Sequence, residues 1–237
     1  GRQGDFTPDA GQEELVERAL DTPYDSPTLE KLCQGKRDIV IISSDHTRPV
    51  PSRVTMPILL RRIHAAAPEA HVRILVATGM HRPSTHEIVM HVATDDEAMV
   101  EIGTLPSGGK CIINRIAAEA DLLLAEGFIE PHFFAGFSGS RKSVLPGVAS
   151  YKTIMYNHNG QFVHDPRSRA GIIEGNRVHD DMMAAAEMGY LGHYNKNKVS
   201  PFERFEVGGD GMSGYNMYGI DIIAVRGYEE GALDPSN

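Results

Sequence analysis

One short run of aliphatic residues, Asp38-Ile-Val-Ile-Ile-Ser43, constrains the fold of this chain more than any other feature. Unbroken apolar runs of this length are typical of strands buried on both faces of a parallel sheet. A second strand is expected at Val72–Ala77, where only Arg73 interrupts the apolar residues, and it follows a segment whose apolar residues recur at helical spacing. Two parallel strands joined by a helix form a βαβ unit, in which helices cover the sheet. We therefore predict an α/β fold with an open, largely parallel, Rossmann-like sheet and helices on both faces.

Less regular patterns extend this prediction along the chain. Further strands are expected at Lys110–Asn114 and Ala120–Ala125. Helices are expected at Glu13–Leu20, Tyr151–His158 and Arg177–Met188. Another is expected to begin at Ser52, which would cap it, and to end at Pro68. A polar helix that carries His86 and His91 is expected to begin at Ser84 or Thr85. We assign residues 1–188 to a cofactor-binding and catalytic domain. Residues 189–237 form a Gly-, Asn- and Tyr-rich tail without assignment, for which the remnant of a second domain is one interpretation.

Composition excludes several classes of protein. The 237 residues are 41% hydrophobic, which is enough to bury a substantial core, and they carry a formal net charge of −9. This charge, with no dense basic run, argues against a general nucleic-acid binder. No apolar run approaches the roughly 20 residues that span a bilayer, and the first residues do not resemble a signal peptide. We expect a cytoplasmic protein whose two cysteines, Cys33 and Cys111, are reduced structural thiols.

Polar loops follow three of the expected parallel strands. They contain Asp45–Arg48, His81–Arg82 and His132–Lys142. The carboxyl ends of parallel strands lie along one edge of an open α/β sheet, and ligands bind at that edge. The topology alone would thus bring these three segments together, and their basic residues would allow an acidic protein to bind an anionic ligand.

The longest of these loops, Glu130–Gly147, sets an imidazole, a guanidinium and an ammonium among glycines and three phenylalanines. Gly136, Gly139 and Gly147 can adopt positive φ and let the backbone approach a ligand, while the rings exclude water. Lys142 is either a point charge for a phosphate or, if desolvated, an amine nucleophile. The loop fails the phosphate-loop pattern because Arg141 precedes the lysine, and the first strand lacks the G-x-G-x-x-G signature of dinucleotide sites. A surface loop with solvated charges is the simpler alternative.

Other residues at this edge suggest binding and proton transfer. Asp45 can accept from ribose hydroxyls and Arg48 can fork onto a phosphate, although a helix cap and a surface charge would explain them equally. His81 and His132 follow separate strands, and imidazoles can exchange protons at neutral pH. His158 can return to the same pocket as a metal ligand if an organic cofactor supplies the other ligands.

Taken together, these residues resemble the nickel-pincer nucleotide-dependent lactate racemase family, specifically its N-terminal catalytic domain. The resemblance covers approximately residues 38–188, and the motif from His132 to Gly147 is highly specific. The matching segments, in order, are Asp45-His-Thr-Arg-Pro, Ala77-Thr-Gly-Met-His-Arg-Pro, Glu130-Pro-His-Phe-Phe-Ala-Gly-Phe-Ser-Gly-Ser-Arg-Lys-Ser-Val-Leu-Pro-Gly, Tyr156-Asn-His and Gly175-Asn-Arg-Val-His.

The resemblance implies a division of roles. Lys142 would be linked covalently to a pyridinium-3,5-bisthiocarboxylic acid mononucleotide that binds nickel, with His158 as a further nickel ligand. His81 and His132 would be the paired acid and base. The remaining cofactor-binding set that we predict comprises Asp45, Thr47, Arg48, Arg82, Gly136, Ser138, Gly139 and Arg141.

The implied reaction is racemisation or epimerisation of a small, lactate-like 2-hydroxy acid by proton-coupled hydride transfer, with two histidines serving the two enantiomers. The implied partners are this substrate and the cofactor-synthesis enzymes, and we expect the protein to bind neither nucleic acid nor a membrane. Family members resemble two-domain proteins, and no counterpart of the closing domain is identified in this sequence. One alternative is therefore a non-catalytic nucleotide- or anion-binding module, and a less favoured one is a hydrolase with a zinc or phosphate site.

Overall fold

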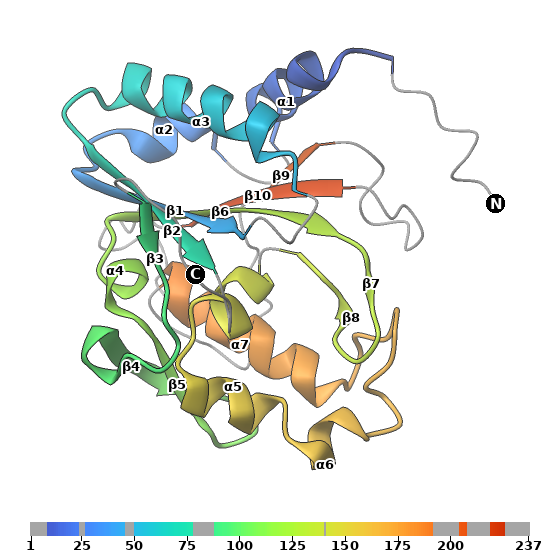
Figure 1. The fold of residues 1–237 in the computed structure, drawn as a ribbon. Helices are drawn as coiled ribbons and strands as arrows, with labels where there is room; N and C mark the ends of the chain where they lie inside the picture. The colour runs from blue at the N-terminus through green and yellow to red at the C-terminus, as the bar shows by residue number, and fades with distance from the viewer. Residues whose placement is uncertain are drawn as a thin grey trace, which may run out of the picture.

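The computed structural model describes residues 9–23, 27–45, 50–77, 88–139, 141–191, 204–207 and 219–225. Its main sheet has six strands in the order β3-β2-β1-β6-β10-β9, drawn in Figure 1. Neighbouring strands from β3 to β6 run parallel, whereas β10 is antiparallel to both β6 and β9. The strand bounds are β1 Asp38–Ser44, β2 His71–Ala77, β3 Ile88–Met90, β6 Leu122–Ile129, β9 Arg204–Val207 and β10 Gly219–Val225. The predicted largely parallel α/β sheet is confirmed.

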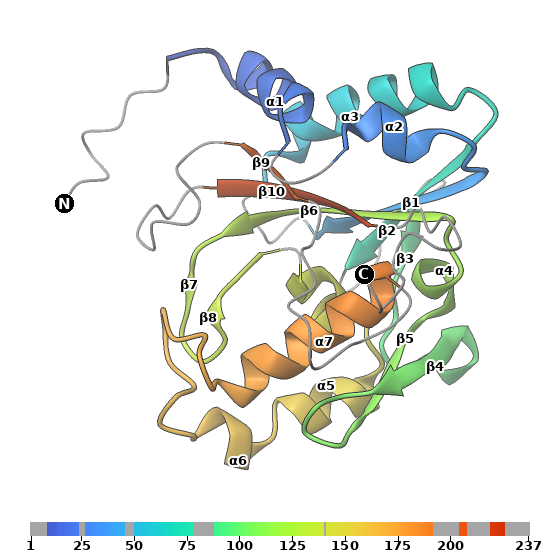
Figure 2. The same cartoon turned by 180° about the vertical axis from the view of Figure 1, so that it is seen from behind.

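Helices cover both faces of this sheet (Figures 1 and 2). One face is covered by α1 (Gln12–Asp21), α2 (Leu29–Cys33) and α3 (Ser52–Ala66). The other face is covered by α4 (Arg115–Ala118), α5 (Tyr151–Asn157) and α7 (Arg177–Leu191), and α6 (Gly160–Val163) lies beyond α5. Successive residues of β1 point to opposite faces. Ile39 and Ile41 join the core beneath α1–α3, whereas Val40 and Ile42 join the core beneath α7. All four are fully buried, which explains why the strand reads as an unbroken apolar run.

A buried carboxylate joins β1, β6 and the start of α3. Glu126 of β6 accepts hydrogen bonds from the hydroxyls of Ser43, at 2.6 Å, Thr55, at 2.5 Å, and Ser52. Ser52, which we predicted to cap the helix, is instead its first residue after Pro51 and makes no capping hydrogen bond with its side chain. Its hydroxyl is used by Glu126 because a buried carboxylate is costly unless it is well hydrogen-bonded.

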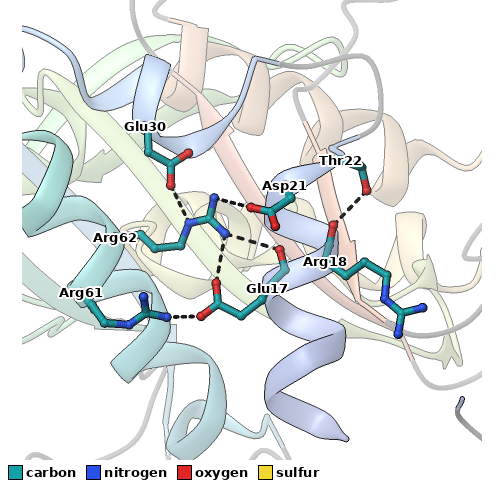
Figure 3. Close-up of polar contacts among 7 residues, drawn as sticks. All are labelled: Glu17, Arg18, Asp21, Thr22, Glu30, Arg61 and Arg62. Atoms are coloured by element: carbon teal, nitrogen blue, oxygen red, sulfur yellow. Dashed lines mark hydrogen bonds and ion pairs between the residues drawn. The ribbon is translucent and has the colours of Figure 1, made fainter. Parts of the chain in front are cut away.

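On the outer side of the same helix, Arg62 connects α3 to α1 and α2. Its guanidinium lies 3.1 Å from Glu17, 2.8 Å from Asp21 and 2.5 Å from Glu30, as Figure 3 shows. These ion pairs fasten the three helices of this layer to one another above the apolar contacts that hold them on the sheet.

The segment that follows β2 differs from the sequence prediction. Residues 78–87 lie outside the described part, but the predicted polar helix does not continue through His91, because Ile88–Met90 form strand β3 beside β2. This short apolar run pairs with the sheet edge. His91 is fully buried rather than on a polar surface, and its ring contacts the carbonyl of Ala149, at 2.9 Å, and the amide of Asn114.

Two short hairpins lie outside the main sheet. Strand β4 (Met99–Thr104), preceded by the single turn η2 (Asp96–Ala98), pairs with β5 (Lys110–Asn114). The bounds of β5 were predicted correctly, but β4 was missed because its Glu101 and Gly103 interrupt the apolar pattern. The second hairpin joins β7 (Pro131–His132) to β8 (Gly136–Phe137) and leads to the irregular turn η3 (Ser143–Gly147).

Helix α7 ends at Leu191, and the strands β9 and β10 that follow extend the main sheet beyond β6. The division between residues 188 and 189 stays a prediction. Within the described residues, no helix combines the length and the apolar character needed to cross a membrane.

Candidate functional site

The order of the sheet brings the exits of three parallel strands to one edge. Strand β1 lies between β2 and β6, and Asp45, which is 8% exposed, directly follows it. A Cβ on Gly147 would lie 3.0 Å from the Cβ of Ala77, so η3 packs against the end of β2. The described ends of β1 and β2 therefore lie close to the turn η3. Four of the predicted residues lie outside the described part, and their roles stay predictions: Thr47, Arg48, His81 and Arg82.

Backbone geometry accounts for two of the three glycines in the long loop. Gly136 has a φ of +77° and Gly139 a φ of +118°, which side chains rarely adopt. A Cβ on Gly136 would also lie 2.6 Å from the carbonyl oxygen of Ile172, so this glycine lets two loops pack together. Gly147 does not have positive φ, contrary to our expectation. It is required by space instead, since its Cβ would lie 2.9 Å from the carbonyl oxygen of Lys142.

Ser138 and Arg141 both bind the backbone of their own loop. Ser138 donates its N–H to the carbonyl of Glu130, at 2.7 Å, and its hydroxyl accepts from the N–H of Glu130, at 2.8 Å. The buried guanidinium of Arg141 donates to the carbonyls of Ala135, Phe137 and Ser138. These contacts give both residues a role in shaping the loop, and their predicted contacts with a cofactor stay predictions.

The ring of Phe134 lies at the centre of three predicted site residues. The imidazole of His132 packs against it edge-on with centroids 4.6 Å apart, and the imidazole of His158 does so at 5.1 Å. The ammonium of Lys142 lies 5.9 Å from the centroid of the same ring. Phe134 is 9% exposed, whereas Phe133, which stacks on His132, is 74% exposed. Only one of these two neighbouring rings can therefore shield the site from water.

His158 is held in its neutral form. Burial, followed by the positive charge of Lys142, lowers the pKa of His158 to about 4. Its Nδ1 atom is buried and has no hydrogen-bond partner in the part of the chain that the structure describes. A neutral imidazole with an available nitrogen is the form that binds transition metals.

His132 has one nitrogen engaged by the loop. Its Nδ1 lies 3.3 Å from the N–H of Ala135, which donates to it. In the neutral ring, an acceptor at Nδ1 places the hydrogen on Nε2. The contact is long for a hydrogen bond, so it can open at little cost.

Sequence reasoning assigned no role to two further residues at this loop. Asn176 donates from Nδ2 to the carbonyl of Phe134, at 2.9 Å. The pKa of His179 is lowered to about 3 by burial and by the charge of Arg141. Both residues belong to the Gly175-Asn-Arg-Val-His motif, and that signal was visible in the sequence.

A metal bound to His158 would need ligands from a second molecule or from other parts of the chain. Among the described residues, no three histidine, cysteine, aspartate or glutamate side chains are placed to hold a metal ion. The arrangement fits a cofactor that brings most of the ligands for its own metal, because one neutral imidazole then completes the set.

Comparisons with known proteins identify the family. The model of the lactate racemase N-terminal domain matches residues 2–171. The lactate racemase of Lactiplantibacillus plantarum is 60% identical, over 76% of this chain and 46% of its own length. That of Thermoanaerobacterium thermosaccharolyticum is 48% identical, over 80% of this chain and 48% of its own. The structure of the lactate racemase apoprotein from the latter organism superposes with a TM-score of 0.74 at 50% identity, covering 76% of this chain and 46% of that one.

The chain thus spans about half the length of the curated relatives that it matches. The match to the family model covers most of the chain and includes the loop built around Phe134. This chain belongs to the lactate racemase family, of which it contains the N-terminal domain.

Proposed function

We propose that this chain is the cofactor-binding and catalytic part of a racemase or epimerase that acts on a small, lactate-like 2-hydroxy acid. The observation that carries the proposal is the gathering of His132, Lys142 and His158 around the ring of Phe134. Membership of the lactate racemase family supports it. Since the chain spans about half of its relatives' length, the activity of the whole protein is part of this proposal.

The residues present fit a nickel-pincer nucleotide. The side-chain nitrogen of Lys142, after losing a proton to become the free amine, would be the covalent attachment point. The neutral imidazole of His158 would be the nickel ligand, and Asp45 would contact the nucleotide. When bound, this group supplies an acceptor and donor of hydride for the carbon that is inverted. Phe134, buried between Lys142 and His158, keeps water away from that chemistry.

The chain's own residues move the proton. His132 would take the hydroxyl proton of one enantiomer, and His81 would serve the opposite face of the substrate carbon. With Ala135 donating to Nδ1, the neutral ring of His132 carries its hydrogen on Nε2 and cannot accept a second proton there. Proton uptake at Nε2 requires the tautomer with hydrogen on Nδ1, so we expect the contact with Ala135 to open during the reaction.

The test is to produce the protein together with the cofactor-synthesis enzymes and to compare it with Lys142→Ala and Lys142→Arg. The arginine variant is the matched control, because it keeps the positive charge beside Phe134 and His158 but removes the amine. Intact-mass analysis should show an adduct on the parent protein and on neither variant, and only the parent should racemise D- and L-lactate. An active Lys142→Ala protein without an adduct would overturn the proposal.

A non-catalytic nucleotide- or anion-binding module is the second candidate, which the positive charges of Lys142 and Arg141 in the loop would also suit. It predicts that nicotinic acid mononucleotide, a pyridinium mononucleotide, raises the melting temperature while no 2-hydroxy acid is racemised. Racemisation by the cofactor-loaded protein would exclude this candidate.

A further inference from the structure

The Gly175-Asn-Arg-Val-His179 motif has no role in the proposed reaction, yet its asparagine contacts the candidate site through the backbone. Asn176 is fully buried immediately before α7, in the Ncap position of that helix. Its place between a helix and the loop of Phe134 suggests that it does more than end the helix.

The two ends of the Asn176 amide bind different elements. Nδ2 donates to the carbonyl of Phe134, at 2.9 Å, and to the carbonyl of Ile172, at 3.0 Å. Oδ1 accepts from the N–H groups of Val178, at 3.1 Å, and His179, at 3.2 Å. One side chain therefore caps α7 with its oxygen and holds the loop with its nitrogen.

The contact with Phe134 reaches the proposed chemistry in a single step. Fixing the carbonyl of Phe134 fixes the peptide that carries its ring, and that ring contacts His132, His158 and Lys142. Reacting groups must be held within about 0.5 Å of their productive positions, and residues behind them supply this precision. A long helix is a rigid anchor for such a contact.

We propose that Asn176 is a positioning residue of the site, which couples the first turn of α7 to Phe134 and so sets the arrangement of His132, Lys142 and His158. The predicted effect of Asn176 on catalysis rests on the proposed function. The coupling between Asn176 and the loop is a property of the chain alone and can be measured without the cofactor.

Two substitutions separate the capping role from the positioning role. Asn176→Asp and Asn176→Ser each keep a side-chain oxygen that can cap α7. The ionised aspartate has no hydrogen for the carbonyl of Phe134, and the serine hydroxyl is too short to reach it. Both variants should therefore retain the helix and release the loop. The serine variant covers the case in which a buried carboxylate prevents folding.

Asn114 offers a matched control. It is also a buried capping asparagine, with Oδ1 accepting from the N–H of Ile116 and its Nδ2 placed 3.3 Å from Nδ1 of His91. Asn114→Asp and Asn114→Ser make the same chemical changes without touching Phe134. Any general loss of stability should therefore appear in both pairs of variants.

Hydrogen exchange in the unloaded protein provides the first measurement. We expect faster exchange in peptides covering residues 130–142 for the Asn176 variants and unchanged exchange there for the Asn114 variants. Equal exchange in the two pairs would overturn the inference, whether or not the protein proves to be a racemase.

The cofactor-loaded protein provides the second measurement, with rates normalised to the fraction carrying the Lys142 adduct. We expect the Asn176 variants to lose at least about tenfold in kcat with KM for lactate changed less than about threefold, because the groups are displaced rather than removed. Asn114 variants should keep both values. Unchanged kcat in folded Asn176 variants would sink the inference, whereas a parent protein with neither adduct nor activity would sink the proposed function instead.

Discussion

Positive charge has opposite effects in two regions of this molecule. In the layer of α1–α3, Arg62 meets three carboxylates (Figure 3). Burial opposes ionisation there, yet the hydrogen bond from Arg62 holds the pKa of Glu30 below its usual value, and Glu30 and Asp21 raise the pKa of Arg62. In the loop of Phe134, the charges of Lys142 and Arg141 act in the same direction as burial and lower the pKa values of two histidines.

The difference separates a structural region from a chemical one. Opposite charges around Arg62 keep each other ionised and join helices. At the loop, burial and then the like charges of Lys142 and Arg141 keep His158 and His179 neutral. The Nδ1 atoms of both rings are buried without a hydrogen-bond partner among the described residues. Such neutral nitrogens cost stability but remain able to bind a metal or exchange a proton. Neutral imidazoles whose buried Nδ1 atoms have no hydrogen-bond partner among the described residues therefore distinguish the candidate site from the ion-pair network.

The largest expected effect comes from removing one of these neutral imidazoles. His158→Ala should lose nickel from the cofactor-loaded protein, with retention after dialysis reduced at least about tenfold, because the neutral imidazole proposed as its protein ligand is gone. Metal analysis of the dialysed protein measures this. His164→Ala is the control, since His164 is exposed and, among the described residues, its ring has a hydrogen bond only with the carbonyl of Gly160 in its own turn. Equal nickel retention in the two variants would remove His158 from the site.

A smaller effect, on stability alone, is expected in the ion-pair layer. Arg62→Met should lower the free energy of unfolding by about 2 kcal/mol, because Arg62 is 11% exposed and its loss leaves three carboxylates facing one another. Urea denaturation measures the change. Arg61→Met is the control, since Arg61 is 63% exposed and pairs only with Glu17 among the described residues, so it should cost less than about 1 kcal/mol. A loss of Lys142 adduct formation in folded Arg62→Met would contradict the separation of the two regions.

The neutral histidines also predict how stability depends on pH. Their folded pKa values, about 4 for His158 and about 3 for His179, lie below the ordinary value of 6.5. As pH falls below 6.5, the unfolded chain takes up protons first, so the contribution of each histidine is complete above pH 6.5 and is lost toward its folded pKa. We expect about 1.8 kcal/mol of loss per histidine between pH 7 and pH 5.

Urea denaturation of His179→Gln at the two pH values tests this dependence, because the variant removes one titrating group and should reduce the pH-dependent loss accordingly. If His179→Gln retained the full difference between pH 7 and pH 5, His179 would not be held neutral in the folded protein.

Many strands and helices of the fold were predictable from local sequence patterns. The run at Asp38–Ser43 became the central strand β1, and Tyr151 and Arg177 begin helices where the periodicity placed them. The convergence of three strand exits followed from topology. The misassignment at His91 has a physical cause: a histidine buried between a carbonyl and an amide looks in sequence like any polar residue, and only tertiary contacts reveal its two partners.

The inner structure of the site was not predictable in the same way. The role of Phe134 as the common neighbour of His132, Lys142 and His158 depends on contacts between residues up to 26 positions apart, and Phe133 beside it carries the same side chain in an exposed position. Asn176 likewise acts through a backbone carbonyl, which no side-chain pattern encodes. Sequence motifs marked the right segments, and packing decided which residue in each segment matters.

The smallest expected effect is a difference between the two regions in the rate at which their buried cysteines are labelled. Cys33 lies in the core beneath α1–α3 and Cys111 in the core beneath α7. Both are unpaired and buried, as predicted, and burial raises each pKa to about 12, so both thiols should react slowly with a disulfide reagent at pH 8.

The rates of labelling should nevertheless differ slightly. Labelling a buried thiol requires local opening, and regions that carry function open more readily than well-paired structural ones. In Cys33→Ala and Cys111→Ala proteins, each with one remaining thiol, we expect Cys111 to be labelled a few times faster than Cys33. Arg62→Met should then bring the rate at Cys33 closer to that at Cys111, because the ion pairs that fasten α1 and α2 to α3 are gone. A faster reaction at Cys33 in the parent protein would show that the ion-pair layer, rather than the loop side, is the less stable part of the fold.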